Sequence, residues 1–355
     1  MRAKGLSLKR TSLKEIASIT GFSITTVSMV LNGRGGEFNI SNETRELILA
    51  AAKEHNYQPN LHARSLRTRT TDILGLTVPT LVNPFFSQMA ETFESLARAD
   101  RKLALITVTH YDRAEELDAV NYFLSQKADC VFTANLMALE EVSDLCSRAG
   151  TKQILLDSQE SAKSTVSTDN FEAGRVLTRN LLASMAAAGR EGPVYYVGGM
   201  AEHKITQHRL AGFKAALLER GLSFTPGQFI ETRFDADLAY REIRKLFRAH
   251  EDLGGIFLNA LPPLEGLVRF FPEAAETCRK VHYGVFDYHP IMSLLGDLHI
   301  LIIKQSPDAM MQKAYQIFSK NEGGEAGIHF TPYELILTPS VRPLLEPAGQ
   351  KARSL

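Results

Sequence analysis

The chain has 355 residues, of which 44% are hydrophobic and 23% are charged, and its formal net charge at pH 7 is zero. This composition is typical of a globular protein, and the length favours more than one domain because a single core rarely grows beyond roughly 250–300 residues. Apolar runs fall short of the roughly 18–20 residues that span a bilayer, and no long apolar stretch follows the basic N-terminus. We therefore expect a cytoplasmic protein rather than a membrane or secreted one.

Cysteine usage points the same way. The three cysteines, Cys130, Cys146 and Cys278, are far apart and odd in number. They match neither a metal-ligand spacing nor the disulfide framework of a small secreted protein. We expect buried, reduced thiols, with no bound metal and no cofactor.

The zero net charge hides an asymmetry along the chain. Residues 1–70 carry eleven Lys or Arg against five Asp or Glu, a net charge of +6, and the remaining residues carry a net charge of −6. A basic N-terminal fifth on an acidic body indicates that this end meets a polyanion. The alternative is that these charged faces are merely solvated.

The first predicted elements are two short helices separated by a glycine. Ser12 and Glu15 have the spacing of a capping box, which starts a helix that Gly21 ends. Ser23 then caps a second helix over residues 24–31. Two helices joined by such a turn form a helix-turn-helix motif, whose second helix can lie in the major groove of DNA. The alternative is an ordinary helical hairpin.

A third helix is expected from Ser41 to about His55, and Pro59 cannot continue it. The segment 61–67 that follows is basic and compatible with a helix, but it is too short to be stable alone. It would need a partner, which could be DNA or a twin subunit.

From residue 71 the pattern changes to strands that alternate with helices. Such alternation predicts parallel sheets that are covered on both faces, and about 270 residues hold two such units. Ligands of open parallel sheets bind beyond the carboxyl ends of the strands. The predicted strands are residues 73–78, 103–108, 130–134, 153–156, 194–197, 255–258, 281–286 and 300–303.

Polar or aromatic side chains follow most of these strands. Carboxylates, amides and an arginine can bind the hydroxyls of a sugar, and aromatic rings can pack on its C–H face. For each single residue the alternative is a helix cap or a turn, and for Phe85 or Phe86 it is core packing. The candidates are residues 83–86, Thr109-His110, Asn135, Asp157-Ser158, Asp169-Asn170, Asp287 and Gln305.

Several motifs together resemble the lactose/galactose repressor (LacI/GalR) family, and the resemblance spans residues 12 to about 340. In the N-terminal part they are Leu13-Lys14-Glu15-Ile16-Ala17, Thr25-Thr26-Val27-Ser28, Val30-Leu31-Asn32-Gly33, Glu43-Thr44-Arg45, Asn56-Tyr57-Gln58-Pro59-Asn60 and Ala63-Arg64-Ser65-Leu66. In the remainder they are Ile73-Leu74-Gly75-Leu76, Asn83-Pro84-Phe85-Phe86, His208-Arg209-Leu210-Ala211-Gly212-Phe213, Leu264-Glu265-Gly266, Phe286-Asp287 and Lys304-Gln305.

The chain departs from the family pattern at four places. Met29 replaces a usual basic residue, and the loop 34–42 is about three residues longer; both features resemble the branch of the sucrose-operon and fructose repressors. The usual Asn-Asp pair reads Ala260-Leu261, and the usual Asp-Arg reads Asp157-Ser158. A family pose for a sugar therefore cannot be copied unchanged.

The resemblance implies roles in DNA binding. The second helix would face the major groove, residues 60–67 would form a hinge helix that orders on DNA, and Leu66 would be a wedge in a minor-groove step. The alternative for Leu66 is a simple linker residue. The implied DNA-binding residues are Ser23, Ile24, Thr25, Thr26, Ser28, Met29, Asn32, Asn60, Ala63, Arg64 and Leu66.

The resemblance also implies an α/β two-lobed, periplasmic-binding-protein-like sensor behind a small all-α headpiece. The expected domains are a headpiece over 1–59, a hinge over 60–70 and an effector-binding and dimerisation domain over 71–345. Lobe one would span about 71–166 and 306–330, lobe two about 167–303 and 333–345, with crossings near 166–169, 304–306 and 331–333. The implied effector-binding residues are Phe85, Phe86, Asn135, Asp157, Asp169, Arg209, Asp287 and Gln305.

The predicted function is a sequence-specific DNA-binding transcriptional regulator, a repressor of a sugar-utilisation operon under allosteric control. Its expected partners are double-stranded operator DNA, a second copy of the chain, and a small sugar or sugar phosphate such as fructose, a fructose phosphate or a sucrose-related molecule. The alternative is a two-lobed sugar-binding receptor without a DNA-binding role. No phosphate loop or hydrolase motif points to an enzyme.

Overall fold

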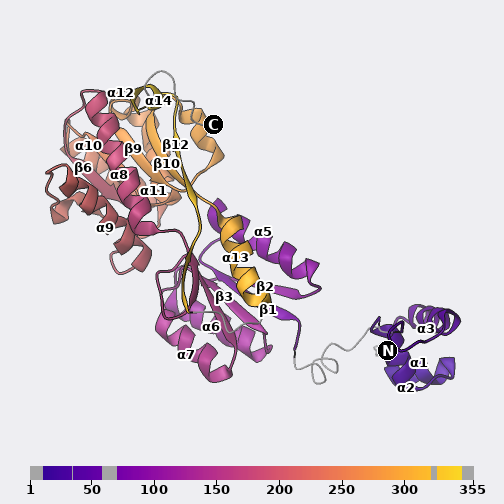
Figure 1. Ribbon diagram of the computed structural model, residues 1–355. Helices are drawn as coiled ribbons and strands as arrows, with labels where there is room; N and C mark the ends of the chain where they lie inside the picture. The colour runs from indigo at the N-terminus through magenta and orange to yellow at the C-terminus, as the bar shows by residue number, and fades with distance from the viewer. Residues whose placement is uncertain (1–10, 34, 58–69, 321–325, 346–355) are drawn as a thin grey trace, which may run out of the picture. The chain divides into compact units, whose positions relative to one another are not determined.

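The structure, a computed structural model, describes residues 11–33, 35–57, 70–320 and 326–345. It divides into two compact units between Thr71 and Asp72 (Figure 1). The predicted hinge over 60–70 lies outside the described residues except for Thr70. Each unit is taken by itself below.

The headpiece consists of the three helices that the sequence predicts: α1 (Leu13–Thr20), α2 (Ile24–Leu31) and α3 (Asn42–Glu54). The capping box at the start of α1 is present, since Ser12 Oγ accepts from the Glu15 amide at 3.2 Å and the Glu15 carboxylate accepts from the Ser12 amide at 2.7 Å. Gly21 ends α1 with a left-handed φ of 73°. A small core fixes the three helices, formed by the buried residues Ile16, Ala17, Val27, Val30 and Ile48.

Lobe one of the second unit is built on a six-stranded parallel sheet. Its strands are β1 (Ile73–Val78), β2 (Leu103–Val108), β3 (Cys130–Ala134), β4 (Lys152–Leu156), β5 (Ser164–Ser167) and β11 (Gly327–Phe330), in the order β11-β5-β4-β3-β1-β2. Helices α5 (Pro84–Ala99) and α13 (Pro307–Ser319) pack together on one face, whereas α6 (Arg113–Ser125) and α7 (Leu139–Ala149) cover the other.

Lobe two repeats this architecture. Its strands are β6 (Val194–Val197), β7 (Phe229–Ile230), β8 (Gly255–Leu258), β9 (His282–Phe286), β10 (His299–Gln305) and β12 (Tyr333–Leu337), in the order β12-β10-β9-β8-β6-β7, and only β12 is antiparallel to its neighbour. Helices α8 (Asn170–Ala187) and α9 (Lys204–Glu219) cover one face, and α10 (Ala236–Ala249) and α11 (Leu261–Phe270) cover the other. The short helices α12 (Ala275–Cys278) and α14 (Arg342–Leu345) follow in the chain.

Three chain segments cross between the lobes, and Figure 1 shows the last of them as the yellow segment that leads into β12. The crossings connect β5 to α8, β10 to α13 and β11 to β12. Thr331 donates its amide to the Ser167 carbonyl at 2.8 Å, which joins the first and third crossings. Gln305 stands opposite Tyr333 in the β10–β12 ladder, which joins the second and third.

The strands predicted from apolar runs are confirmed, with shifts of one or two residues at the ends of β4, β9 and β10. The prediction missed four strands, β5, β7, β11 and β12. Cys130, Cys146 and Cys278 are buried and form no disulfide. Among the described residues, no helix is both long and apolar enough to cross a membrane.

Candidate functional site

Four polar side chains meet where the carboxyl ends of the two sheets face each other. Asn135 and Asp157 follow β3 and β4 of lobe one, whereas Asp287 follows β9 and Gln305 ends β10 of lobe two. Each lobe pairs an amide with a carboxylate: Asn135 Nδ2 donates to Asp157 Oδ2 at 3.1 Å, and Gln305 Nε2 donates to Asp287 Oδ1 at 2.6 Å. All four residues are buried. Three of them, all but Gln305, have a left-handed φ of 46–70°, a strained conformation that is common at functional sites.

Arg209 on α9 adds a buried guanidinium, which is held from three sides. Its Nε donates to Asn170 Oδ1 and its Nη1 donates to the Asn259 carbonyl, both at 2.7 Å. Its Cζ lies 3.9 Å from the centre of the Phe286 ring, a cation–π contact. The backbone of Arg209 packs directly on Gly174 of α8, where a Cβ would lie 2.7 Å from the Arg209 carbonyl oxygen. We call Asn135, Asp157, Arg209, Asp287 and Gln305 the polar cluster.

The charges of the polar cluster influence one another across the lobes. The pKa of Asp157 is raised to about 6, first by burial and also by the charge of Asp287, while Arg209 lowers it. Burial likewise raises the pKa of Asp287, against the lowering effects of Arg209 and the Gln305 hydrogen bond. Nearby, burial lowers the pKa of His203 to about 4, so its imidazole is neutral at physiological pH.

Two aromatic rings from opposite lobes stack on each other near the polar cluster. Tyr111, beyond the end of β2, stacks on Phe234, beyond the end of β7, with ring centroids 4.7 Å apart and an interplanar angle of 14°. The ring of His203 meets both edge-on, at 6.4 and 5.8 Å. Burial and then the charges of Asp157 and Asp287 raise the pKa of Tyr111, which indicates that its ring lies close to these carboxylates.

Two cavities adjoin these groups. The first, of about 600 Å³, is lined from lobe one by His110 and Tyr111 and from lobe two by Phe234, Leu261 and Ile291 among others. We call it the outer cavity. Its volume lies within the range of roughly 300–1,000 Å³ that holds small molecules.

The second cavity, of about 370 Å³, we call the inner cavity. It reaches the polar cluster itself, because Asp287 and Gln305 line it together with Phe85 and Lys304. Both cavities are bounded by residues of both lobes, so a ligand here would contact the two lobes at once.

Several polar atoms at this place are left without a hydrogen bond. Asn135 Oδ1, Asp157 Oδ1, Gln305 Oε1 and both ring nitrogens of His203 are buried and find no partner among the described residues. A buried polar atom without a partner costs free energy, so a molecule that binds here and supplies the missing partners would be stabilised. The atoms from Asn135, Asp157 and Gln305 are all acceptors, which favours a partner rich in hydroxyl donors. No group of three or more His, Cys, Asp or Glu suited to a metal ion occurs within the described ranges.

The candidate effector residues fall into three groups. Phe85 and Phe86 both pack in the core of lobe one, and Phe85 also lines the inner cavity. Asp169 caps α8, since its Oδ1 accepts from the Glu172 amide at 2.9 Å. The structure brings together the five residues Asn135, Asp157, Arg209, Asp287 and Gln305.

Four contributors, Tyr111, Phe234, Asn259 and His203, lay outside the list of candidates that the sequence produced. Tyr111 lies just beyond the candidates Thr109-His110, and Phe234 follows β7, a strand that was not predicted. Asn170 and Asn259 hold Arg209 in place. The Asn259 side chain turns inward, where it accepts from the Tyr196 hydroxyl at 2.6 Å. His203 gave no signal beyond its position just before α9.

The headpiece presents a second candidate surface on α2. Ser23 caps this helix, because its Oγ accepts from the Thr26 amide at 3.0 Å. Ile24 has an exposed fraction of 44%, which is high for an apolar residue. The remaining candidates on this helix are exposed or half-buried, and they are Ser23, Thr25, Thr26, Ser28, Met29 and Asn32.

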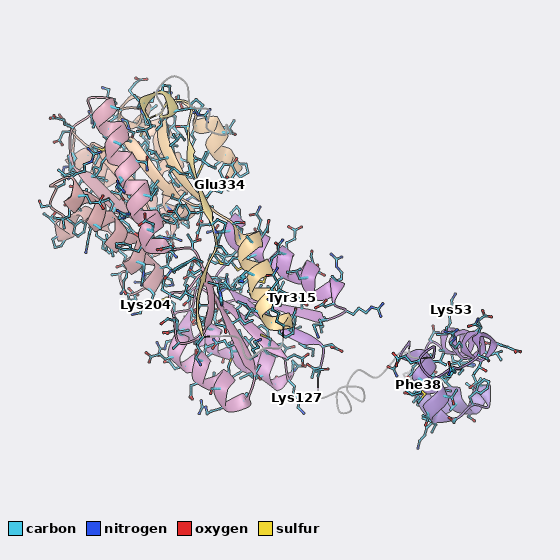
Figure 2. All side chains as sticks on the ribbon, in the orientation of Figure 1. Phe38, Lys53, Lys127, Lys204, Tyr315 and Glu334 are labelled. Carbon is cyan, nitrogen blue, oxygen red and sulfur yellow. The ribbon has the colours of Figure 1, made fainter. Side chains whose placement is uncertain are left out.

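Two further features of the headpiece bear on the sequence predictions. Phe38, labelled in Figure 2, lies exposed in the loop between α2 and α3, which is the loop predicted to be longer than in the family. The candidates Asn60, Ala63, Arg64 and Leu66 lie outside the described residues, so their predicted contacts with DNA stay predictions.

Two family models match the chain. The model described as "Bacterial regulatory proteins, lacI family" matches residues 12–60, and the model described as "Periplasmic binding protein domain" matches residues 74–325. A crystal structure of a LacI-family transcriptional regulator from Silicibacter pomeroyi has the same fold, with a TM-score of 0.76 at 19% identity over 94% of this chain and 100% of that one.

Curated relatives agree with this assignment. The sucrose operon repressor of Klebsiella pneumoniae is 29% identical over 90% of this chain and 95% of its own length. The ribitol operon repressor of Klebsiella aerogenes is 31% identical over 54% of this chain and 72% of its own length, and the fructose operon regulatory protein of Vibrio cholerae is 27% identical over 80% and 86%. The chain therefore belongs to the lacI family of bacterial regulatory proteins, with a helical headpiece followed by a two-lobed periplasmic-binding-protein-like domain.

Proposed function

We propose that this chain is a sequence-specific DNA-binding regulator that represses a sugar-utilisation operon and is controlled by a small carbohydrate. One observation carries the proposal: a single lacI-family chain combines a helix-turn-helix headpiece with a polar cluster that has unpartnered acceptors between two lobes. Its sucrose, ribitol and fructose operon relatives support control by a sugar. These relatives are regulators, and we accordingly propose ligand binding rather than catalysis.

On the DNA side, α2 is the recognition helix. Its outward residues, between Ser23 and Asn32, would lie in the major groove. Its inward residues Val27 and Val30 pack in the headpiece core and hold the helix in place. The hinge residues Asn60, Ala63, Arg64 and Leu66 would add contacts in the minor groove. The excess of basic residues in 1–70 makes binding strongly salt-dependent, because each neutralised phosphate releases counterions.

On the effector side, the ligand binds between the lobes and favours one lobe arrangement. Asn135 and Asp157 contact it from lobe one, while Arg209, Asp287 and Gln305 hold it from lobe two. Phe85 contributes an apolar wall, and Phe86 and Asp169 act behind the site by packing and capping. The coupling between ligand and DNA is reciprocal, and a coupling of about 1–3 kcal/mol changes either affinity about 5- to 150-fold.

The active species is a homodimer. Two headpieces related by a two-fold axis read a near-palindromic site, since the symmetry of the operator mirrors that of the protein. Because its operator would lie on the chromosome, the protein would act in the cytoplasm.

The test is a gel-shift experiment with the full chain against fragments of its own genome, with and without sucrose, ribitol and fructose. We expect one or a few fragments with near-palindromic sequences to shift, and a sugar to change the affinity at least about fivefold. Failure to shift any fragment, combined with tight sugar binding, would instead identify a sugar receptor without a DNA-binding role.

A further inference from the structure

We propose that the effector is an uncharged, hydroxyl-rich molecule and that the site between the lobes rejects its phosphorylated form. This inference rests on the proposed function, and it goes further because it selects between the two classes of carbohydrate that a sugar-operon regulator can sense. It follows from which polar atoms of the site are still available for a ligand, and from the balance of charge around them.

The available atoms are acceptors. Each amide of the polar cluster has its NH₂ group turned to a carboxylate, at 3.1 Å for Asn135 and at 2.6 Å for Gln305. This fixes the orientation of both amides, because a carboxylate can only accept. Their carbonyl oxygens and Asp157 Oδ1 remain without a partner among the described residues. Hydroxyl groups can donate to all three atoms, whereas a phosphate dianion has only acceptor oxygens to offer.

The one guanidinium of the cluster is already engaged. Arg209 uses Nε on Asn170 and Nη1 on the Asn259 carbonyl, and its flat face lies on Phe286. Of its five N–H groups, Nε and one on Nη1 already donate, so the edge formed by Nε and Nη2 is not free for a bidentate grip on a phosphate. Its charge is also outnumbered by the two carboxylates of Asp157 and Asp287, which both lie within its electrostatic reach.

Two other basic residues that line the outer cavity already pair with carboxylates. Arg233, beside the outer cavity, pairs with Glu231 at 3.0 Å and with Glu202 at 3.5 Å. His110 pairs with Glu115 at 2.8 Å. At these positions a phosphate would compete with an existing carboxylate.

The two basic residues at the inner cavity offer an anion no better place. His289 already accepts from the Ile291 amide through Nδ1 at 3.1 Å. Lys304 lies 5.3 Å from the centre of the Tyr288 ring and lines the inner cavity together with Asp287. A phosphate that reached Lys304 would also meet that buried carboxylate.

The charge balance therefore favours a neutral ligand. A sugar phosphate carries close to two negative charges above its second pKa near 6. Next to Asp157 and Asp287 it would meet like charges in a place shielded from water, where charge repulsion is weakly screened. A neutral sugar instead donates hydroxyls to the same carboxylates and satisfies the unpartnered amide oxygens.

The experiment is isothermal titration of the full chain with matched pairs of ligands, at a mildly alkaline pH where the phosphates are fully ionised. The pairs are D-fructose with its 1- and 6-phosphates, sucrose with sucrose 6-phosphate, and ribitol with ribitol 5-phosphate. We expect the neutral member of any pair that binds to be at least about tenfold tighter than its phosphate ester. A phosphate ester that binds as tightly as its neutral partner, or more tightly, would overturn the proposal while leaving the proposed function intact.

Variants link the selectivity to the two carboxylates. The double variant Asp157→Asn, Asp287→Asn removes both charges at nearly constant shape, so its preference for the neutral member should fall at least about threefold relative to the wild type. The control Asp144→Asn removes a charge from the exposed face of α7 and should leave the preference unchanged. Equal preference in all three proteins would overturn the proposal. If no member of any pair binds the wild type, both this inference and the sugar control in the proposed function fail, whereas DNA binding in the gel shift remains a separate result.

Discussion

Tyr111 of lobe one stacks on Phe234 of lobe two, with the ring centroids 4.7 Å apart. Each ring follows the end of a strand, β2 in one case and β7 in the other, so the pair joins the two sheets directly across the gap between the lobes. The same pair borders the outer cavity and lies near the carboxylates of the polar cluster. The same two side chains therefore form a contact between the lobes and part of the wall of the outer cavity.

A double-mutant cycle on this pair should show coupling. Stacked aromatic pairs are worth about 0.5–1.5 kcal/mol beyond the area that they bury, so Tyr111→Ala and Phe234→Ala should be non-additive by that amount in the free energy of unfolding. Urea denaturation of the wild type, the two single variants and the double variant gives the coupling. A parallel cycle that pairs Phe234→Ala with the exposed Tyr122→Ala should be additive, and additivity in both cycles would show that the stacking does not connect the lobes.

The free energy of unfolding should depend on pH through the protonation of Asp157. Its folded pKa, about 6, lies above the ordinary value of 3.8, so the folded chain keeps this proton longer than the unfolded chain. The free energy of unfolding should therefore fall as the pH rises from about 4 to about 6, by about 3 kcal/mol from this residue alone, and stay level above that range. Asp157→Asn should remove this fall and should be more stable than the wild type at neutral pH. Denaturation curves across the range test the sign; a variant with the wild-type slope would contradict it.

Removal of two helix caps in the headpiece should distinguish an effect on stability from an effect on DNA binding. Ser23 caps α2 and Ser41 caps α3, and each hydroxyl accepts from the amide three residues on. Replacing either by alanine should cost about 0.5–2 kcal/mol of headpiece stability, measured by hydrogen exchange. Only Ser23 lies at the start of the proposed recognition helix, so Ser23→Ala should weaken operator binding about tenfold more than Ser41→Ala in fluorescence anisotropy, a difference of about 1.4 kcal/mol. Equal losses of affinity would remove Ser23 from the DNA contacts.

Close packing of α8 on α9 should prove essential for placing Arg209. A Cβ at Gly212 would lie 2.1 Å from the Phe171 carbonyl oxygen, so Gly212→Ala must push the helices apart. Such overpacking should cost about 1–3 kcal/mol of stability and reduce sugar binding, because Arg209 lies one turn earlier on α9. In the control Gly227→Ala the new methyl group meets nothing within 4 Å. A Gly212→Ala variant with wild-type stability and sugar affinity would show that this contact is adjustable.

Much of the fold could be predicted because it is built from strands buried on both faces. Strands such as β1 and β8 are continuous apolar runs, and their positions follow from the sequence alone. The strands that were missed lack this signal: β5 reads Ser-Thr-Val-Ser, and β7 has only two residues. Their strand conformation depends on neighbours in the sheet, which a local pattern does not contain.

The same reasoning explains what could be predicted of the site. Asn135, Asp157 and Asp287 each follow a recognisable strand, so the rule that ligands bind at the carboxyl ends of strands finds them. Phe234 follows a strand that was itself missed. Asp169 and Asn170 are neighbours in the chain, but they have different roles. The Asp169 carboxylate caps α8, whereas the Asn170 side chain accepts a hydrogen bond from Arg209.

The three crossings between the lobes are hydrogen-bonded to one another through Ser167, Thr331 and the Gln305–Tyr333 pair. They therefore act as a single narrow strip rather than as three independent tethers. We expect such a strip to resist sliding and twisting of the lobes more than bending, so that bending about the strip is the main relative motion. Gln305 belongs both to this strip and to the polar cluster. A ligand that binds its amide would therefore contact the segment about which the lobes bend.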